Sequence, residues 1–80
     1  MKIRFHGRLA QAIGAEIDLD SVAGSCVREL RRRLAAEHPA AAATLEDRRA
    51  VACVGGAIVR DDHVIAAGDA VEFLPPVSGG

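Results

Sequence analysis

A single long amphipathic segment, residues 26–37, is the feature that most limits what this chain can fold into. Val27, Leu30 and Leu34 lie three and four residues apart, which places them on one stripe of an α-helix. No other segment has a comparable helical stripe of this length. Because a single helix can cover only one face of a sheet, any strands must form a sheet that this helix packs against on one side.

Both ends of this helix are marked in the sequence. Ser25 or Cys26 is the expected N-cap, and Glu29 places negative charge in the first turn, where the helix dipole favours it. At the other end, Pro39 pushes His38 out of helical geometry, so the helix should stop there.

Short strand-like segments flank the helix on both sides. Alternating or β-branched residues predict strands at 2–6, 15–20, 50–54, 57–60 and 71–74. Gly55-Gly56 predicts a two-residue hairpin turn, because both residues accept positive φ. Helical turns are expected within 7–14 and 40–47. The first two strands should form a hairpin-like pair.

The predicted element order is β-β-α-β-β-β. This order indicates an α+β fold, a β-grasp (ubiquitin-like) roll in which a mixed sheet packs against one main helix. We expect a β-grasp domain over 1–74 and a flexible C-terminal Gly-Gly tail over 75–80. Pro75-Pro76 divides the two, because proline has no N–H to continue a strand ladder.

Size and charge narrow the possible functions. An 80-residue chain with two aromatic residues has a thin core, which suits a carrier, adaptor or subunit better than an enzyme with a deep pocket. A net charge of −1 gives no general attraction to nucleic acid or anionic membranes. The apolar run 50–59 is about half a membrane span. We expect a soluble, cytoplasmic protein.

The C-terminal sequence carries the clearest chemical signal, and it reads Leu74-Pro75-Pro76-Val77-Ser78-Gly79-Gly80. The two prolines favour an extended polyproline geometry, and six such residues reach roughly 18 Å. Glycine without a Cβ passes through narrow clefts. The terminal carboxylate of Gly80 is ionised at neutral pH and can attack the α-phosphate of ATP. An ordinary frayed terminus is the alternative explanation.

The sequence resembles the MoaD family, the small sulfur-carrier subunits of molybdopterin synthase. The resemblance covers nearly the whole chain and is strongest at 45–47, 51–54, 62–63 and 68–80. It implies a β-grasp fold and a Gly80 carboxylate that is adenylated by a partner and converted to a thiocarboxylate. The large subunit would then accept the tail and use its sulfur to build the dithiolene of molybdopterin.

The resemblance also assigns roles along the tail. Gly80 would supply the reacting group, and partners would recognise Gly79, Ser78, Val77, Pro76 and Pro75. Leu74 and His6 stand where aromatic residues are usual in the family, at the expected partner interface, and an apolar patch around Leu74 and Val77 is the candidate surface.

The partners implied by the resemblance are three proteins. They are the molybdopterin synthase large subunit, in a heterotetramer, a ubiquitin-activating-type adenylating enzyme and a sulfurtransferase. The adenylating enzyme would use ATP, and the chain itself would bind no cofactor. On this view the chain is a non-catalytic, sulfur-donating subunit whose active site lies mainly in the large subunit. No phosphate-binding loop or catalytic triad is present in the sequence.

Two alternatives stay open at the level of sequence. The same tail chemistry could serve another acceptor, in thiamin or cysteine biosynthesis or in tRNA thiolation. The chain could also be a non-catalytic β-grasp binding module or a protein modifier.

The remaining reactive or charged residues have structural interpretations. Cys53 is expected to be a small core residue and Cys26 a cap-region residue. The run Arg31-Arg32-Arg33 is expected to spread over the solvated outer face of the helix.

The histidines and the other arginines give no clear site. His6, His38 and His63 belong to different elements, so no metal site is expected from them. Arg48, Arg49 and Arg60 flank the Gly55-Gly56 hairpin, and either a partner contact or solubility would explain them.

Overall fold

The computed structural model describes residues 1–76. Its elements, in chain order, are β1 (Lys2–Phe5), α1 (Gly7–Ile13), β2 (Glu16–Asp18), α2 (Val27–Glu37), the 3-10 turn η1 (Pro39–Ala41), α3 (Ala42–Glu46), β3 (Val51–Val54), β4 (Ala57–Val59) and β5 (Val71–Leu74). All five predicted strands and the main helix are present. The second strand is shorter than the predicted 15–20.

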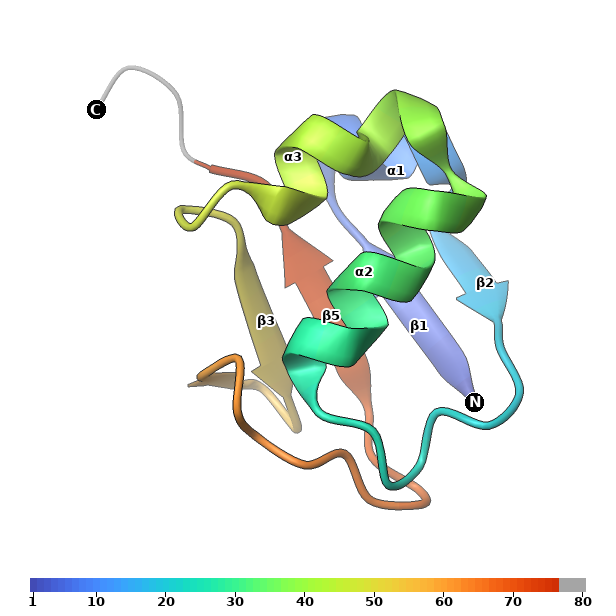
Figure 1. Ribbon diagram of the computed structural model, residues 1–80, viewed down its shortest axis with the longest axis vertical. Coiled ribbons are helices and arrows are strands. Elements are labelled where there is room, and N and C mark those ends of the chain that lie inside the picture. The colour runs from blue at the N-terminus through green and yellow to red at the C-terminus, as the bar shows by residue number, and fades with distance from the viewer. Residues whose placement is uncertain (77–80) are drawn as a thin grey trace.

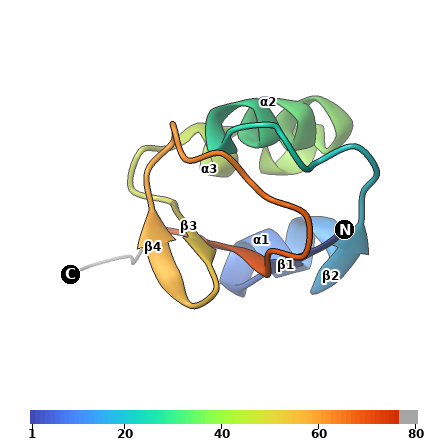
Figure 2. The ribbon, with the colours of Figure 1, turned by 90° about the horizontal axis from the view of Figure 1, so that it is seen from below.

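The strands form one mixed sheet in the order β2-β1-β5-β3-β4. The central strand β5 runs parallel to β1 and antiparallel to β3, while β1 and β2 form the expected antiparallel pair. Helices α2 and α3 lie over one face of this sheet, and α1 lies at one of its ends (Figures 1 and 2). This is the predicted β-grasp arrangement, with two further short helices beside the main one.

The core lies between α2 and the covered face of the sheet. In β1 the exposed and buried residues alternate, so that Ile3 and Phe5 point toward α2. Phe73 of β5 is fully buried, and its ring stacks on Phe5 with centroids 6.0 Å apart. Leu30 is buried from the helix side, as the predicted stripe requires.

Helix α2 begins with a capping box at Cys26. The Glu29 backbone N–H donates to the Cys26 sulfur, and the Cys26 backbone N–H donates to Glu29 Oε1 at 3.0 Å. That hydrogen bond lowers the pKa of the Glu29 carboxyl. The helix ends at His38, as Pro39 predicts.

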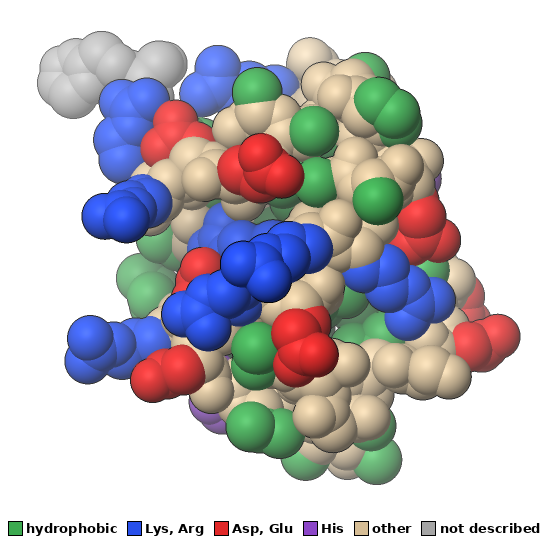
Figure 3. All heavy atoms as spheres, viewed as in Figure 1, with side chains coloured by type: hydrophobic (Ala, Val, Ile, Leu, Met, Phe, Trp, Pro, Cys, Tyr) green, Lys and Arg blue, Asp and Glu red, His purple; other side chains and the backbone are tan. Residues whose placement is uncertain are grey.

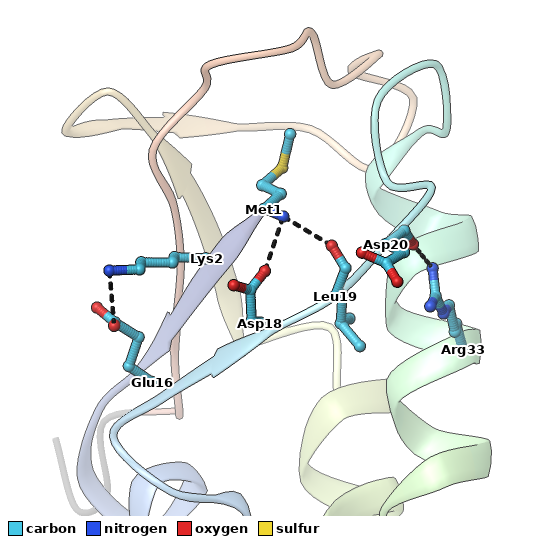
Figure 4. Close-up of polar contacts among 7 residues, drawn as sticks. All are labelled: Met1, Lys2, Glu16, Asp18, Leu19, Asp20 and Arg33. Carbon is cyan, nitrogen blue, oxygen red and sulfur yellow. Dashed lines mark hydrogen bonds and ion pairs between the residues drawn. The ribbon is translucent and has the colours of Figure 1, made fainter.

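Polar contacts connect β2 and the segment after it to the rest of the fold (Figure 4). The Met1 amine donates to Asp18 Oδ1 at 2.9 Å and to the Leu19 carbonyl at 2.7 Å. The same amine lowers the pKa of the Asp18 carboxyl. On the helix side, the Arg33 guanidinium donates to the Asp20 carbonyl, which joins α2 to this segment.

Candidate functional site

The candidate site begins where the central strand β5 ends. Leu74, its last residue, is half-buried and pairs with Val51 of β3. The preceding residue, Phe73, accepts a hydrogen bond at its carbonyl from the His6 backbone N–H at 3.1 Å. Because β5 lies between β1 and β3, these two strands fix the direction in which the chain leaves the sheet.

Pro75 leaves the sheet against the start of α1. A Cβ placed on Gly7 would lie 2.9 Å from the Pro75 Cγ atom, closer than side chains pack, and Gly7 has a φ of +55°. Glycine is therefore favoured at position 7 both by backbone conformation and by the approach of the proline ring. Pro76 is buried. No local sequence pattern indicates this contact, because it joins residues that are far apart in the chain.

His6 and Glu72 stand beside the same strand end. His6 Nε2 and Glu72 Oε1 are 3.0 Å apart, with the imidazole about half exposed. This contact and the half-buried Leu74 lie next to the point where Pro75 leaves the sheet. A role of His6 and Leu74 in a partner interface stays a prediction.

The other residues assigned to the tail, Val77, Ser78, Gly79 and Gly80, lie outside the described residues. The boundary between a domain at 1–74 and a tail at 75–80 likewise stays a prediction.

Arg31 is buried, so the expectation of a solvated arginine was wrong at this position. Only 8% of the Arg31 surface is exposed. Its Nη1 donates to the Leu45 carbonyl at 2.8 Å, its Nη2 to the Ala50 carbonyl at 2.7 Å, and its Nε to Asp61 Oδ1 at 3.0 Å. The guanidinium carbon also lies 5.5 Å from the centroid of the Phe73 ring, a cation–π distance.

The position of Arg31 on the helix could have predicted this burial. At about 100° per residue, Arg31 falls four positions after Val27 and three before Leu34, within the apolar stripe. A charged residue on a buried stripe predicts a set of buried acceptors. Arg32 is exposed and Arg33 is half-buried.

Asp47 and Arg49 order the turn that leads from α3 into β3. The Asp47 Oδ1 atom accepts from the Arg49 backbone N–H at 2.9 Å, and Oδ2 accepts from Arg49 Nη2 at 2.9 Å. The Arg49 side chain, its backbone N–H and its charge lower the pKa of Asp47 to about 2. The same pair raises the pKa of Arg49. Arg49 therefore has an internal partner.

Two large apolar side chains are exposed that the sequence pattern did not single out. Ile58 of β4 is 72% exposed and Val64 is 61% exposed. Ile58 pairs across the ladder with Cys53, which is buried as expected. Cys26 is half-buried at the start of α2.

Within residues 1–76, no group of three or more His, Cys, Asp or Glu side chains is placed to hold a metal ion. In the same part of the chain, no helix is both long and apolar enough to cross a membrane. The described part of the site consists of the anchored end of β5 and the exit of Pro75 from the sheet.

Comparison with known sequences gives two concordant matches. The model of the ThiS family matches residues 3–80. The molybdopterin synthase sulfur carrier subunit of Escherichia coli (strain K12) is 32% identical over 80 residues, covering 100% of this chain and 99% of that protein.

Solved structures share the same fold. SAMP1, the small archaeal modifier protein 1, from Haloferax volcanii aligns with a TM-score of 0.73 at 25% identity, covering 99% of this chain and 97% of that chain. A putative molybdopterin converting factor, subunit 1, from Pyrococcus furiosus aligns with a TM-score of 0.72 at 28% identity, covering 95% of both chains. These matches confirm the predicted β-grasp fold.

Proposed function

This chain belongs to the ThiS family of ubiquitin-like sulfur carriers, and from that membership we propose that it is the sulfur-carrying small subunit of a molybdopterin synthase. The observation that carries the proposal is the full-length, 32% identity to the Escherichia coli sulfur carrier subunit of that enzyme. The Pro75–Gly80 sequence supports it, because a stiff, narrow tail suits delivery of a carboxylate into another protein's active site.

The proposed reaction takes place at the Gly80 carboxylate in two steps. A carboxylate oxygen attacks the α-phosphorus of ATP, pyrophosphate leaves, and an acyl adenylate forms. A sulfide equivalent then attacks the acyl carbon and AMP leaves, which gives a thiocarboxylate. Glycine suits both steps, because it has no side chain to crowd the carbonyl carbon.

The described part of the chain would position the tail. Phe73 anchors the end of β5 in the core, and Pro75 packs against Gly7. Beyond them, Gly79, Ser78 and Val77 would be the recognised sequence, while Pro76, which is buried, would help to direct the tail. The ATP site and the acid–base groups would belong to the activating enzyme, and the chain would hold no cofactor of its own.

The proposed partners follow from the same reasoning. An adenylating enzyme of the ubiquitin-activating type would load the tail, a sulfurtransferase would supply sulfur, and a large subunit would accept the tail in a heterotetramer. His6 and Leu74 would belong to the contact surface, since they flank the strand end from which the tail departs. The proposed location is the cytoplasm.

Mass spectrometry of the intact protein tests the proposal. The chain is incubated with ATP, an adenylating enzyme of this class and sulfide, and we expect the mass gain of one oxygen-to-sulfur exchange. A variant that lacks Gly79-Gly80 should show none. If the full chain shows no exchange while a known carrier does in the same mixture, the proposal is wrong.

The acceptor needs its own experiment. The thiocarboxylate form should co-purify with a molybdopterin-synthase large subunit and transfer sulfur to the pterin precursor. Transfer only to a thiamin precursor, to a cysteine precursor or to tRNA would keep the carrier chemistry and reject molybdopterin synthesis.

A protein modifier is the second candidate, and the likeness to SAMP1 favours it. It predicts covalent adducts between Gly80 and lysine side chains of other proteins. Trapping such adducts by mass spectrometry would support this function.

A further inference from the structure

A groove lined mainly by arginines lies on the helix-covered side of the molecule. It measures about 700 Å³ and runs between α2, the segment joining α3 to β3, and the residues after β4. Lys and Arg side chains gather over α2 and along the side that holds β3 and β4 (Figure 3). We define the arginine groove by Arg28, Arg32, Arg48 and Arg60.

Of the other charged residues that line this groove, all but Glu46 are paired among residues 1–76. Arg31 bonds to Asp61, and Asp47 bonds to Arg49. Within residues 1–76, the four side chains that define the groove form no ion pair and no side-chain hydrogen bond, and all four are exposed. The groove therefore presents an excess of positive charge on a chain whose net charge is −1.

The groove is suited to a chain of spaced carboxylates rather than to a small anion or a nucleic acid. Among the described residues, it contains no buried polar side chain that lacks a hydrogen-bond partner, so no such group is positioned to bind a small ligand. Glu46, Asp47 and Asp61 also line it, and their charges would repel a continuous phosphate backbone. Each free guanidinium can instead take a carboxylate in a bidentate contact.

We propose that the arginine groove binds an acidic segment of a partner protein. Arg48 lies three residues before Val51, which pairs with Leu74 at the end of β5, so the groove reaches the end of the sheet from which the tail departs. If the proposed function holds, the partner is a protein that receives the tail, and the groove would raise its association rate by electrostatic attraction.

Paired substitutions of equal charge test the groove. In R28Q/R32Q two groove charges are lost, while in K2Q/R4Q two exposed charges are lost from β1 on the other face of the sheet. The probe is a fluorescent peptide of alternating Glu and Ser, followed by anisotropy. We expect R28Q/R32Q to weaken binding about five- to tenfold and K2Q/R4Q to leave it nearly unchanged.

A second groove pair guards against a change in folding. R48Q/R60Q removes the charges on the opposite wall of the groove and should weaken peptide binding to a similar degree. Thermal unfolding of every variant is measured to show that the fold is intact. Equal weakening by the groove pairs and the control pair would overturn the proposal. The proposal would also be overturned if a fluorescent oligonucleotide of matched charge bound more tightly than the peptide and if R28Q/R32Q weakened its binding to the same degree.

Kinetics with the adenylating enzyme connect the groove to the tail. Pyrophosphate release should show a KM for R28Q/R32Q raised about five- to tenfold, with kcat unchanged, because the substituted side chains would contribute to binding and not to the reacting group. An unchanged KM would exclude this enzyme as the acidic partner. Absence of any turnover with the unmodified chain would contradict the proposed function, while the peptide titration would still decide the groove.

Discussion

At the scale of single residues, the guanidinium of Arg31 joins three segments that are separate in the sequence. It donates to the Leu45 carbonyl in α3, to the Ala50 carbonyl before β3 and to the Asp61 carboxylate after β4. Buried carbonyls without a donor cost free energy, so this side chain satisfies acceptors that the fold would otherwise leave unpaired. It thereby fixes the segments next to the strand that carries the tail.

Replacing Arg31 by methionine should destabilise the protein strongly. The variant keeps much of the side-chain volume but leaves two buried carbonyls and the Asp61 carboxylate without their donor. We expect a loss of about 3 kcal/mol in the free energy of unfolding, measured by urea denaturation. Arg32→Met, on the exposed position beside it, should change stability by less than about 0.5 kcal/mol. Similar losses in both variants would contradict the assigned role of Arg31.

The contact between Gly7 and Pro75 supports a second prediction. Gly7→Ala places a Cβ against the Pro75 ring and holds alanine at positive φ, so we expect a loss of about 1 kcal/mol or more in the free energy of unfolding. Pro75→Ala in the same background should recover part of this loss, because it removes the ring atom that the Cβ meets.

A double-mutant cycle of Gly7→Ala and Pro75→Ala isolates the contact. A coupling of about 0.5 kcal/mol or more is expected if the ring and the new Cβ meet. Additive effects of the two substitutions would show that only the backbone strain at Gly7 matters.

At the scale of elements, the turn between α3 and β3 depends on an ionised Asp47. Its pKa is lowered to about 2 from the ordinary value of 3.8, so the folded protein binds this proton less readily than the unfolded chain. Stability from this group is therefore fully present above pH 3.8 and is lost as the pH falls toward 2. Glu29 and Asp18 have lowered pKa values and act in the same direction.

Acid titration of stability checks the role of this turn. The urea midpoint should fall as the pH is lowered through this range, and it should fall less steeply in Asp47→Asn than in the unmodified protein. Asp62→Asn, at an exposed carboxylate that forms no ion pair among residues 1–76, is the matched control and should have a much smaller effect on the slope. An equal slope in Asp47→Asn would contradict the role given to Asp47.

At the scale of the whole molecule, folding and tail chemistry should be separable. Within residues 1–76, the buried core extends from Ile3 to Phe73. We therefore expect a chain without Gly79-Gly80 to unfold at the same urea concentration as the full chain while losing all adenylation. A clear loss of stability on this truncation would mean that the terminal residues also support the fold.

The sequence by itself determined the elements, because hydrophobic periodicity, caps and turn residues act over a few neighbouring positions. The stripe at Val27, Leu30 and Leu34, the end at His38 and the Gly55-Gly56 turn were all predictable in this way. The tail motif could also be identified from the sequence, because the residues that define it are consecutive.

Only the tertiary structure decided what long-range packing brings together. The burial of Arg31 depends on acceptors from three later segments, and the approach of Pro75 to Gly7 joins opposite ends of the chain. Likewise, the arginine groove forms because α2, the segment joining α3 to β3 and the residues after β4 lie together in space. Local sequence patterns do not specify such long-range contacts, because the contacts depend on how the whole sheet and helix pack together.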